Sequence, residues 1–233
     1  MKKKWTSLML AKVIDHTLLK ATATEDQIKA LCVEAKEFGF KAVCVNPYWV
    51  PLCVRELADS DVLVATVVGF PLGANASLIK AEEARLAVAQ GADEIDMVIN
   101  IGKAKAGDWA AVRDDIAGVV QASRPAIVKA IIETCYLTQE EKIAACEAAI
   151  SAGATFVKTS TGFGTGGATV EDVSLMKRTI GEVAHVKASG GIKTCEDVVS
   201  MLEAGASRIG ASAGVAIMRE SEALDNKSPE QLS

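Results

Sequence analysis

The feature of this sequence that most constrains its fold is a phrase repeated before buried segments. The phrase reads EFGFKAV, AQGADEI, SAGATFV and EAGASRI, and each copy leaves a helical pattern, passes a glycine and enters a strand-like run. Glycine commonly ends helices because it adopts the left-handed backbone conformation without a side-chain clash. Each copy therefore predicts a helix that ends and a buried strand that begins.

The same alternation continues along most of the chain. Counting Val13–Thr17 as the first, the sequence predicts eight strands, the others being KAVCV (41–45), VLVATVV (62–68), DEIDMVI (93–99), AIVKAII (126–132), TFVK (155–158), AHVKAS (184–189) and SRIG (207–210). Alanine-rich segments with helical spacing lie between them: Thr24–Phe38, Ser77–Gln90, Trp109–Ala122, Thr138–Ala152, Thr169–Ile180 and Thr194–Ala204. Repeated strand–helix units imply parallel strands joined by helical crossovers. Eight of them predict an α/β fold, a (β/α)8 TIM barrel with a short extra N-terminal helix, in preference to an open doubly wound sheet.

Length and composition indicate one soluble domain. A chain of 233 residues, half of them apolar and a quarter charged, can form a single core. We expect the barrel to occupy residues 1–219. The last segment, ESEALDNKSPEQLS (220–233), has almost no apolar content and is predicted to be a disordered polar tail.

Charge and cysteine usage exclude several classes of partner. The net charge of −5 and the lack of a basic stripe argue against nucleic acid. The longest uncharged run, Val62–Ile79, contains glycines and a proline, so we expect no membrane helix. The six cysteines show no CxxC spacing and are predicted to be reduced, which favours the cytoplasm.

Five charged residues interrupt strands that are otherwise apolar. They are Asp15, Asp96, Lys129, Lys158 and Lys187, each on a different predicted strand. A buried charge needs a partner, and a barrel brings such positions together near its C-terminal mouth, where active sites lie. Two carboxylates and three lysines could neutralise one another there. The structural alternative is a salt-bridge cluster, or lysines whose amines reach solvent from the strand ends.

Glycine-rich turns follow the last three predicted strands. Gly162 lies in the loop FVKTSTGFGTGG (156–167), Gly190 and Gly191 follow the next strand, and Gly210 and Ser212 follow the last. Backbone N–H groups in such turns bind anions, and a phosphate site between the last strands recurs in barrels. We therefore predict phosphate binding. The alternative is that these glycines only permit tight turns.

The first of these loops also matches a dinucleotide-binding pattern. GxGxxG occurs at Gly162, Gly164 and Gly167, and Glu182 lies 20 residues beyond the first glycine. The acid of that motif belongs at the C-terminal end of the next strand, whereas Glu182 precedes that strand. We interpret the match as accidental.

Lys158, at the start of this loop, is a candidate nucleophile. An ordinary lysine amine is almost entirely protonated at pH 7, so Schiff-base chemistry needs its pKa lowered by burial or by a second cation. Lys187 lies at the matching end of the next predicted strand and could supply that cation, while Asp96 could transfer protons. These residues are the ones that a covalent aldolase needs. The alternative is that Lys158 acts only through its charge.

Six longer motifs extend this interpretation. FVKTSTGFGTGGAT, VKASGGIKT, DEIDMVIN, VIDHTLLK, AVCVNPYWV and VKAIIET occur between Val13 and Met218, and together the sequence resembles the 2-deoxy-D-ribose-5-phosphate aldolases. The resemblance implies a class I aldolase on a (β/α)8 barrel, without metal or nucleotide cofactor. Such an enzyme reversibly cleaves 2-deoxyribose 5-phosphate to acetaldehyde and glyceraldehyde 3-phosphate, a step of deoxyribose phosphate catabolism and deoxynucleoside degradation. It also implies a homo-oligomer, either a dimer or a tetramer.

The resemblance assigns roles to residues of this chain. Lys158 would be the Schiff-base nucleophile, Lys187 would lower its pKa and assist proton transfer, and Asp96 would donate and accept protons. The remaining assignments are a supporting polar network of Asp15 and Lys129, phosphate binding by Gly162, Gly190, Gly191, Gly210 and Ser212, and a position near the site without a required role for Cys44.

Two departures from the family pattern and two rival functions remain. Ala21 stands where a proline is common, and Ala213 stands where a second serine often contacts phosphate. A rival enzyme would be another lysine-dependent barrel aldolase acting on a different phosphorylated sugar or keto acid. A rival of another class would be a non-catalytic barrel that binds a sugar phosphate.

Overall fold

The chain folds into a closed barrel of eight parallel strands. The structure is a computed structural model that describes residues 5–226. Each strand pairs with its neighbours in chain order, and β8 returns to β1 with Ile209 beside Ile14. The strands are β1 (Ile14–Leu18), β2 (Ala42–Val45), β3 (Leu63–Val68), β4 (Glu94–Val98), β5 (Ile127–Ile131), β6 (Phe156–Lys158), β7 (His185–Ser189) and β8 (Arg208–Ala211). The predicted TIM barrel is confirmed, and the open doubly wound sheet is wrong.

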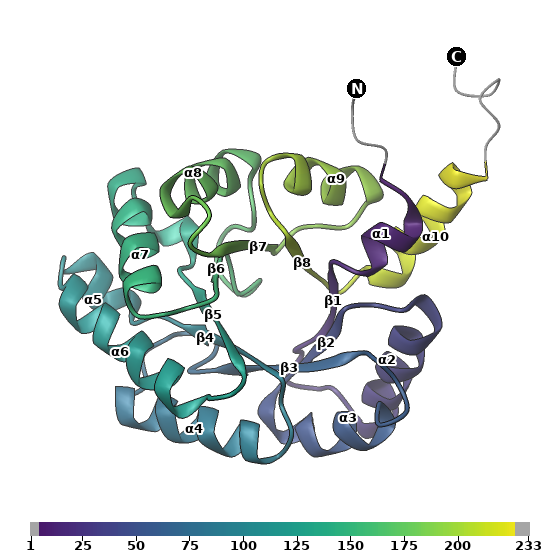
Figure 1. The fold of residues 1–233 in the computed structure, drawn as a ribbon, viewed down its shortest axis with the longest axis horizontal. Helices are drawn as coiled ribbons and strands as arrows, with labels where there is room; N and C mark the ends of the chain where they lie inside the picture. The colour runs from purple at the N-terminus through teal and green to yellow at the C-terminus, as the bar shows by residue number, and fades with distance from the viewer. Residues whose placement is uncertain (1–4, 227–233) are drawn as a thin grey trace.

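Helices form a ring around the barrel, as Figure 1 shows in a view along its axis. The α-helices are α1 (Ser7–Ala11), α2 (Glu25–Phe38), α3 (Val50–Glu56), α4 (Ser77–Ala89), α5 (Ile101–Lys105), α6 (Trp109–Ala122), α7 (Gln139–Ser151), α8 (Val170–Ile180), α9 (Cys195–Glu203) and α10 (Gly214–Asp225). Two short 3-10 helices, η1 (Pro47–Trp49) and η2 (Thr134–Tyr136), follow β2 and β5. The expected short N-terminal helix is α1.

Local sequence explains where the longer helices begin. Thr24 and Thr138 each accept a hydrogen bond from the backbone N–H three residues on, and Gln27 and Glu141 bond back to the cap residue. Such capping boxes satisfy N–H groups that have no partner inside the helix. Gly39 ends α2 in the left-handed conformation, with φ of 64°. This is the helix-stop pattern expected before β2.

Strand alternation separates two apolar regions. Val43 and Val45 of β2 belong to the main cluster, which they share with helical residues such as Ile28 and Ile116. The intervening side chain, Cys44, belongs to a small second cluster. Because successive strand residues point to opposite faces, the main core lies between barrel and helices, and the small one lies inside the barrel.

The polar tail begins later than expected. Residues 220–225, where the sequence predicts a disordered tail, continue helix α10 to Asp225. The segment is held because Ser221 is buried and because the backbone N–H of Ser7, in α1, donates to Asp225 at 2.9 Å. The remainder of the expected tail, 227–233, lies outside the described residues. Within 5–226, no helix has the length and hydropathy needed to cross a membrane.

Candidate active site

Strand register places the predicted charged residues on the inner face of the barrel, four of them as two matched pairs. Asp96 of β4 pairs with Lys129 of β5, and Lys158 of β6 pairs with Lys187 of β7. Asp15 of β1 pairs with Gly210 of β8, which in turn neighbours Ser189 at the end of β7. Residues in matching register on parallel strands present their side chains to the same face. All five charged side chains are at most 3 % exposed.

Asp96 is the carboxylate that joins the three lysines. Its Oδ1 accepts a hydrogen bond from Lys129 Nζ at 2.6 Å. Its Oδ2 accepts from both Lys158 Nζ and Lys187 Nζ, each at 2.7 Å. The two lysine amines therefore share one oxygen atom, which holds the candidate nucleophile and the second cation side by side.

Asp15 and two further residues complete the cluster. Asp15 Oδ2 accepts from Lys187 Nζ at 2.5 Å. Its other oxygen accepts from Arg208 Nη1 at 2.8 Å. Glu94 binds Lys129 Nζ at 2.6 Å and receives two hydrogen bonds from the Arg208 guanidinium. We call the seven side chains the charged cluster: Asp15, Glu94, Asp96, Lys129, Lys158, Lys187 and Arg208.

Sequence reasoning missed Glu94 and Arg208 as members of the cluster. Both stand at the first position of their strands, where a charged side chain ordinarily reaches solvent. Glu94 carried one usable indication, since it lies two residues before Asp96 and so shares its face. Arg208 likewise lies two residues before Gly210 and so shares its face of β8.

The electrostatic environment separates the lysines. Burial lowers the pKa of Lys158, the charge of Lys187 lowers it further, and the attraction of Asp96 only partly opposes them. Burial also acts on Lys187, but Asp15 and Asp96 outweigh it and raise the pKa above its ordinary value. Burial acts on Lys129 too, but Asp96, Asp15 and Glu94 outweigh it and raise the pKa of this lysine. Burial opposes ionisation of Asp96 as well, yet the three lysines hold its pKa well below the usual range.

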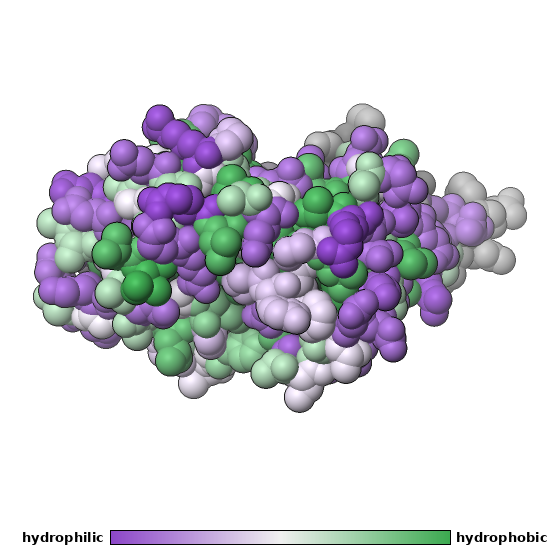
Figure 2. Space-filling view, turned by 90° about the horizontal axis from the view of Figure 1, so that it is seen from below, coloured by the Kyte–Doolittle hydropathy of each residue, from purple (hydrophilic) through white to green (hydrophobic). Residues whose placement is uncertain are grey.

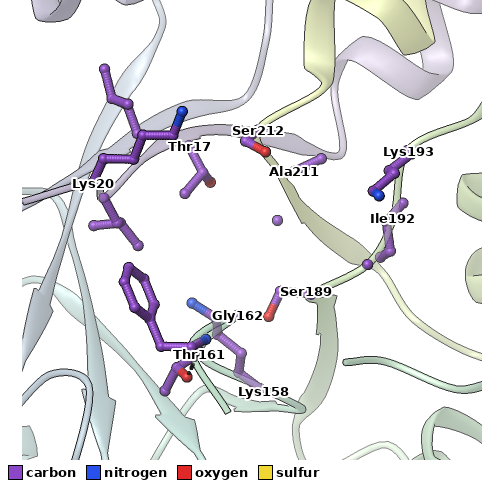
Figure 3. A pocket seen from close by; sticks show the side chains of 16 residues that line it. Thr17, Lys20, Lys158, Thr161, Gly162, Ser189, Ile192, Lys193, Ala211 and Ser212 are labelled. Carbon is purple, nitrogen blue, oxygen red and sulfur yellow. Dashed lines mark hydrogen bonds between the residues drawn. The ribbon is translucent and has the colours of Figure 1, made fainter. Parts of the chain in front are cut away.

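A pocket of ≈ 270 Å³ opens over Lys158 at the C-terminal end of the barrel. Figure 3 shows Lys158 at one side of it, with Ser189 and Ser212 further round. The residues predicted to bind phosphate all line this pocket: Gly162, Gly190, Gly191, Gly210 and Ser212. Nucleophile candidate and glycine turns therefore face one space, large enough for a small sugar phosphate.

The glycine loops pack against each other. A Cβ on Gly167 would lie 2.2 Å from the carbonyl oxygen of Gly190, so only glycine fits there. Gly210 has a different role from the one expected of a turn residue. It lies within β8, where a Cβ would come within 3.2 Å of Lys187 Cε and 3.0 Å of Ser189 Cβ. Its lack of a side chain leaves room for the lysine.

Several pocket residues were not predicted. Lys20 and Lys193 are exposed and line opposite sides of the pocket in Figure 3, where their charges suit an anion. Phe163 of the glycine-rich loop packs edge-on against Phe70, which follows β3, with ring centroids 5.3 Å apart. Neither the spacing of the lysines nor that of the aromatic residues distinguishes them from ordinary surface residues in sequence.

Other predicted positions take simple places. Cys44 is fully buried inside the barrel beside the cluster, and burial together with Asp96 raises its pKa. Ala21 is exposed in the turn between β1 and α2, and Ala213 caps α10 without a side-chain hydrogen bond. Within residues 5–226, no group of three or more histidine, cysteine, aspartate or glutamate side chains is arranged to hold a metal ion.

Comparison with known proteins gives a consistent assignment. A family model described as DeoC/LacD family aldolase matches residues 9–221. The deoxyribose-phosphate aldolase of Carboxydothermus hydrogenoformans is 62 % identical over 92 % of this chain and 96 % of its own length. That of Lysinibacillus sphaericus is 60 % identical over 89 % and 94 %. The solved tetrameric deoxyribose phosphate aldolase of Aeropyrum pernix superposes with a TM-score of 0.89 at 31 % identity, covering 94 % and 93 %. The chain belongs to the DeoC/LacD family of aldolases.

Proposed function

We propose that this chain is a class I aldolase that reversibly cleaves 2-deoxy-D-ribose 5-phosphate to D-glyceraldehyde 3-phosphate and acetaldehyde. The observation that carries the proposal is the position of Lys158, a buried amine of lowered pKa that faces a pocket lined by glycine turns. The curated relatives that match almost the whole chain bear the name of this activity.

The first half of the reaction uses Lys158 as the nucleophile. Its free amine attacks the C1 aldehyde of the open-chain sugar and forms a carbinolamine, which loses water to give an iminium ion. Lys187, whose amine lies 2.7 Å from Asp96 Oδ2, would assist the transfer of a proton to the departing hydroxyl through that carboxylate. The positively charged iminium then accepts the electrons of the C2–C3 bond, because it is an electron sink.

The second half divides the substrate and restores the enzyme. The C3 hydroxyl gives its proton to Asp96, either directly or through a bridging water, as the C2–C3 bond breaks. Glyceraldehyde 3-phosphate leaves, and an enamine remains on Lys158. Protonation at C2 and attack by water on the resulting iminium release acetaldehyde and the free amine. Asp96 can act as the base because the lysines keep it ionised.

The glycine turns are assigned to the phosphate. Backbone N–H groups at Gly162, Gly190 and Gly191 and the Ser212 hydroxyl would hold its oxygens, with Lys20 and Lys193 adding charge from the rim. Ala213 supplies no hydroxyl, so we expect one hydrogen bond fewer to phosphate than in a relative with serine there. This removes a binding contact without touching Lys158.

Borohydride trapping tests the proposal. The protein is incubated with 2-deoxyribose 5-phosphate, reduced, digested and mapped by mass spectrometry. We expect one reduced adduct, on Lys158, and acetaldehyde together with glyceraldehyde 3-phosphate as products before reduction. A Lys36→Arg variant, changed at an exposed lysine, should trap normally. No adduct with ligand still bound would support the non-catalytic sugar-phosphate binder, and other products would support a different aldolase.

We infer that the chain forms homo-oligomers and resides in the cytoplasm. The Aeropyrum relative is tetrameric. Figure 2 shows hydrophobic residues among hydrophilic ones on one face of the molecule, and Tyr48, Leu72 and Val183 are each more than 70 % exposed. The cytoplasmic location is supported by the cysteines, since all six are free thiols. Light scattering after size-exclusion chromatography should give a mass two or four times that of the chain; a monomer at micromolar concentration would contradict the assembly.

A further inference from the structure

Arg208 is a buried cation to which the proposed reaction assigns no step. It begins β8, and the residue is 6 % exposed. Nη1 donates to Asp15 Oδ1 at 2.8 Å and to Glu94 Oε2 at 2.9 Å, and Nη2 donates to Glu94 Oε1 at 3.0 Å. Its guanidinium carbon also lies 5.3 Å from the ring centroid of Phe156. The residue is thus fixed in the charged cluster, beside Lys187 in the strand register.

Arg208 gives the charged cluster one positive charge too many. The cluster holds three carboxylates, Asp15, Glu94 and Asp96, and four cationic side chains, Lys129, Lys158, Lys187 and Arg208. With every group ionised its net charge is +1. None of the seven is more than 6 % exposed, so solvent does little to offset the excess. A buried charge without compensation is costly, and a titratable group in that position neutralises instead.

The contacts decide which cation releases a proton. A guanidinium does not deprotonate in proteins, so the proton has to come from a lysine. Lys129 lies within 3.8 Å of all three carboxylates, and Lys187 contacts Asp15 and Asp96. Lys158 contacts Asp96 alone, through an oxygen that Lys187 also uses. Loss of its proton therefore sacrifices the least attraction.

The other inward-facing groups of the neighbouring strands leave this excess in place. On β2, Cys44 is a thiol whose pKa is raised by burial, so it is neutral. The corresponding side chains of β3, Ala65 and Val67, are apolar. His185, at the amino end of β7, is exposed and packs against the ring of Phe156.

Charged groups at the carboxyl ends of the strands also lie outside the balance. Glu133, which follows β5, is buried but forms no ion pair with the charged cluster; both its oxygens accept hydrogen bonds from the backbone and hydroxyl of Thr161. Lys20 and Lys193 are exposed at the rim of the pocket, where solvent screens them. The excess charge belongs to the cluster itself.

We propose that Arg208 is a positioning residue that keeps Lys158 a free amine: as a buried cation that cannot give up its proton, it leaves the charged cluster one positive charge in excess, and Lys158 removes that excess. The inference rests on the proposed Schiff-base role of Lys158. The directions of the pKa shifts agree with this proposal, since the pKa of Lys158 is lowered whereas those of Lys129 and Lys187 are raised.

Three variants with different charge counts test the proposal. Arg208→Gln balances the cluster, so Lys158 should stay protonated. Glu94→Gln raises the excess to two positive charges and should favour the free amine further. The double variant Glu94→Gln/Arg208→Gln restores an excess of one. For each we would measure kcat/KM against pH and, in parallel, the yield of the borohydride adduct on Lys158 against pH.

The acidic limb of the kcat/KM profile reports the titration of the free enzyme. We expect Arg208→Gln to move it about one pH unit or more toward alkaline pH, with about tenfold lower kcat/KM at pH 7. Glu94→Gln should move the limb toward acid. The double variant should return to within about 0.3 units of the parent. The adduct yield should follow the same order, because trapping also needs the free amine.

Each result tests either the role of Arg208 or the proposed aldolase function on which that role depends. An unchanged limb in Arg208→Gln would overturn the role of Arg208, as would a double variant shifted as far as Arg208→Gln alone, because the effect would then be structural. If Arg208→Gln does not fold, Glu94→Gln and the double variant still have to differ in the predicted order. If the parent forms no adduct on Lys158 at any pH, the proposed function itself fails.

Discussion

A lysine inside a protein remains a free amine only where its surroundings disfavour the protonated form and still hold the side chain in place. Lys158 meets this condition because it is 3 % exposed, has Lys187 as a neighbour and has only Asp96 as a carboxylate partner. The same contact that orients the amine also leaves it the weakest-held cation of the cluster. Nucleophilicity here follows from the number of partners, which a single substitution can change.

Replacing the nucleophile by another cation separates charge from chemistry. Lys158→Arg keeps the positive charge, but a guanidinium stays protonated and cannot form an iminium. We expect kcat/KM for cleavage of 2-deoxyribose 5-phosphate to fall on the order of 10⁴-fold or more. The rate is followed by reduction of the released acetaldehyde in a coupled assay. Lys36→Arg serves as the control, and more than a tenth of the parent activity in Lys158→Arg would refute a covalent role.

At this scale the sequence predicted which residues meet, but not all of them. Alternation along the strands was enough to bring Asp15, Asp96 and the three lysines to the barrel interior. Glu94 and Arg208 were not predicted as members of the cluster, because their burial depends on the stagger between strands. This stagger places Arg208, the first residue of β8, beside Lys187. Stagger is a property of the closed barrel and is absent from any single strand.

Among the elements, the loops after β6 and β7 form one unit. The N–H of Ala168 donates to the carbonyl oxygens of Ser189 and Gly190, at 3.1 and 3.0 Å. Gly167 permits this approach, since its Cβ would overlap the Gly190 carbonyl. The two loops that line the pocket are therefore fixed relative to each other by backbone contacts.

Adding one methyl group at this contact should weaken substrate binding. Gly167→Ala forces the two loops apart by about 1 Å, since a Cβ rarely comes nearer than 3 Å to such an atom. We expect KM to rise about tenfold while kcat changes less, because Lys158 lies on β6 itself. Steady-state kinetics measures both. Gly118→Ala, in the middle of α6 with no atom beyond its own helical turns within 4 Å of the new Cβ, should leave KM unchanged and raise the melting temperature. Equal KM in parent and Gly167→Ala would contradict the loop contact as a determinant of binding.

Element prediction succeeded for the long helices and for the short helix α1 but missed the short helices α3 and α5. Helix α6 occupies the predicted Trp109–Ala122, and α7 (Gln139–Ser151) lies within the predicted Thr138–Ala152. The helices α3 and α5 have seven and five residues, too few for an apolar repeat of 3.6 to be recognised. Both are held by packing against their neighbours, which only the folded chain supplies.

For the whole molecule, the charged cluster links stability to pH. Burial raises the pKa of Asp15 and Asp96, but the adjacent cations outweigh it and leave both values below the ordinary range. A carboxyl with a lowered folded-state pKa stabilises the fold above its unfolded pKa, near 4. That contribution is lost as the pH falls through the folded-state value. The cluster therefore stabilises the barrel at neutral pH and ceases to do so in acid.

Urea unfolding at several pH values should show this dependence. We expect the free energy of unfolding to be nearly constant from pH 7 to about 5 and to fall increasingly below pH 4. Asp96→Asn should lose on the order of 3 kcal/mol at pH 7, because it leaves the three lysines with one carboxylate fewer, and its acid dependence should be weaker. Asp59→Asn, at a side chain 80 % exposed, is the matched control. An acid dependence unaltered by Asp96→Asn would show that other groups control acid unfolding.

The contact between α1 and α10 has a further consequence for how the chain could be rearranged. These helices, the first and last in the sequence, lie side by side in Figure 1 and are joined by the hydrogen bond from Ser7 to Asp225. A short linker could therefore connect the two ends, and new termini could be opened at the exposed turn around Glu182, on the face opposite the pocket. Such a circular permutant keeps every strand-to-helix loop of the site intact. The order of the eight units along the chain is then separable from the chemistry that they enclose.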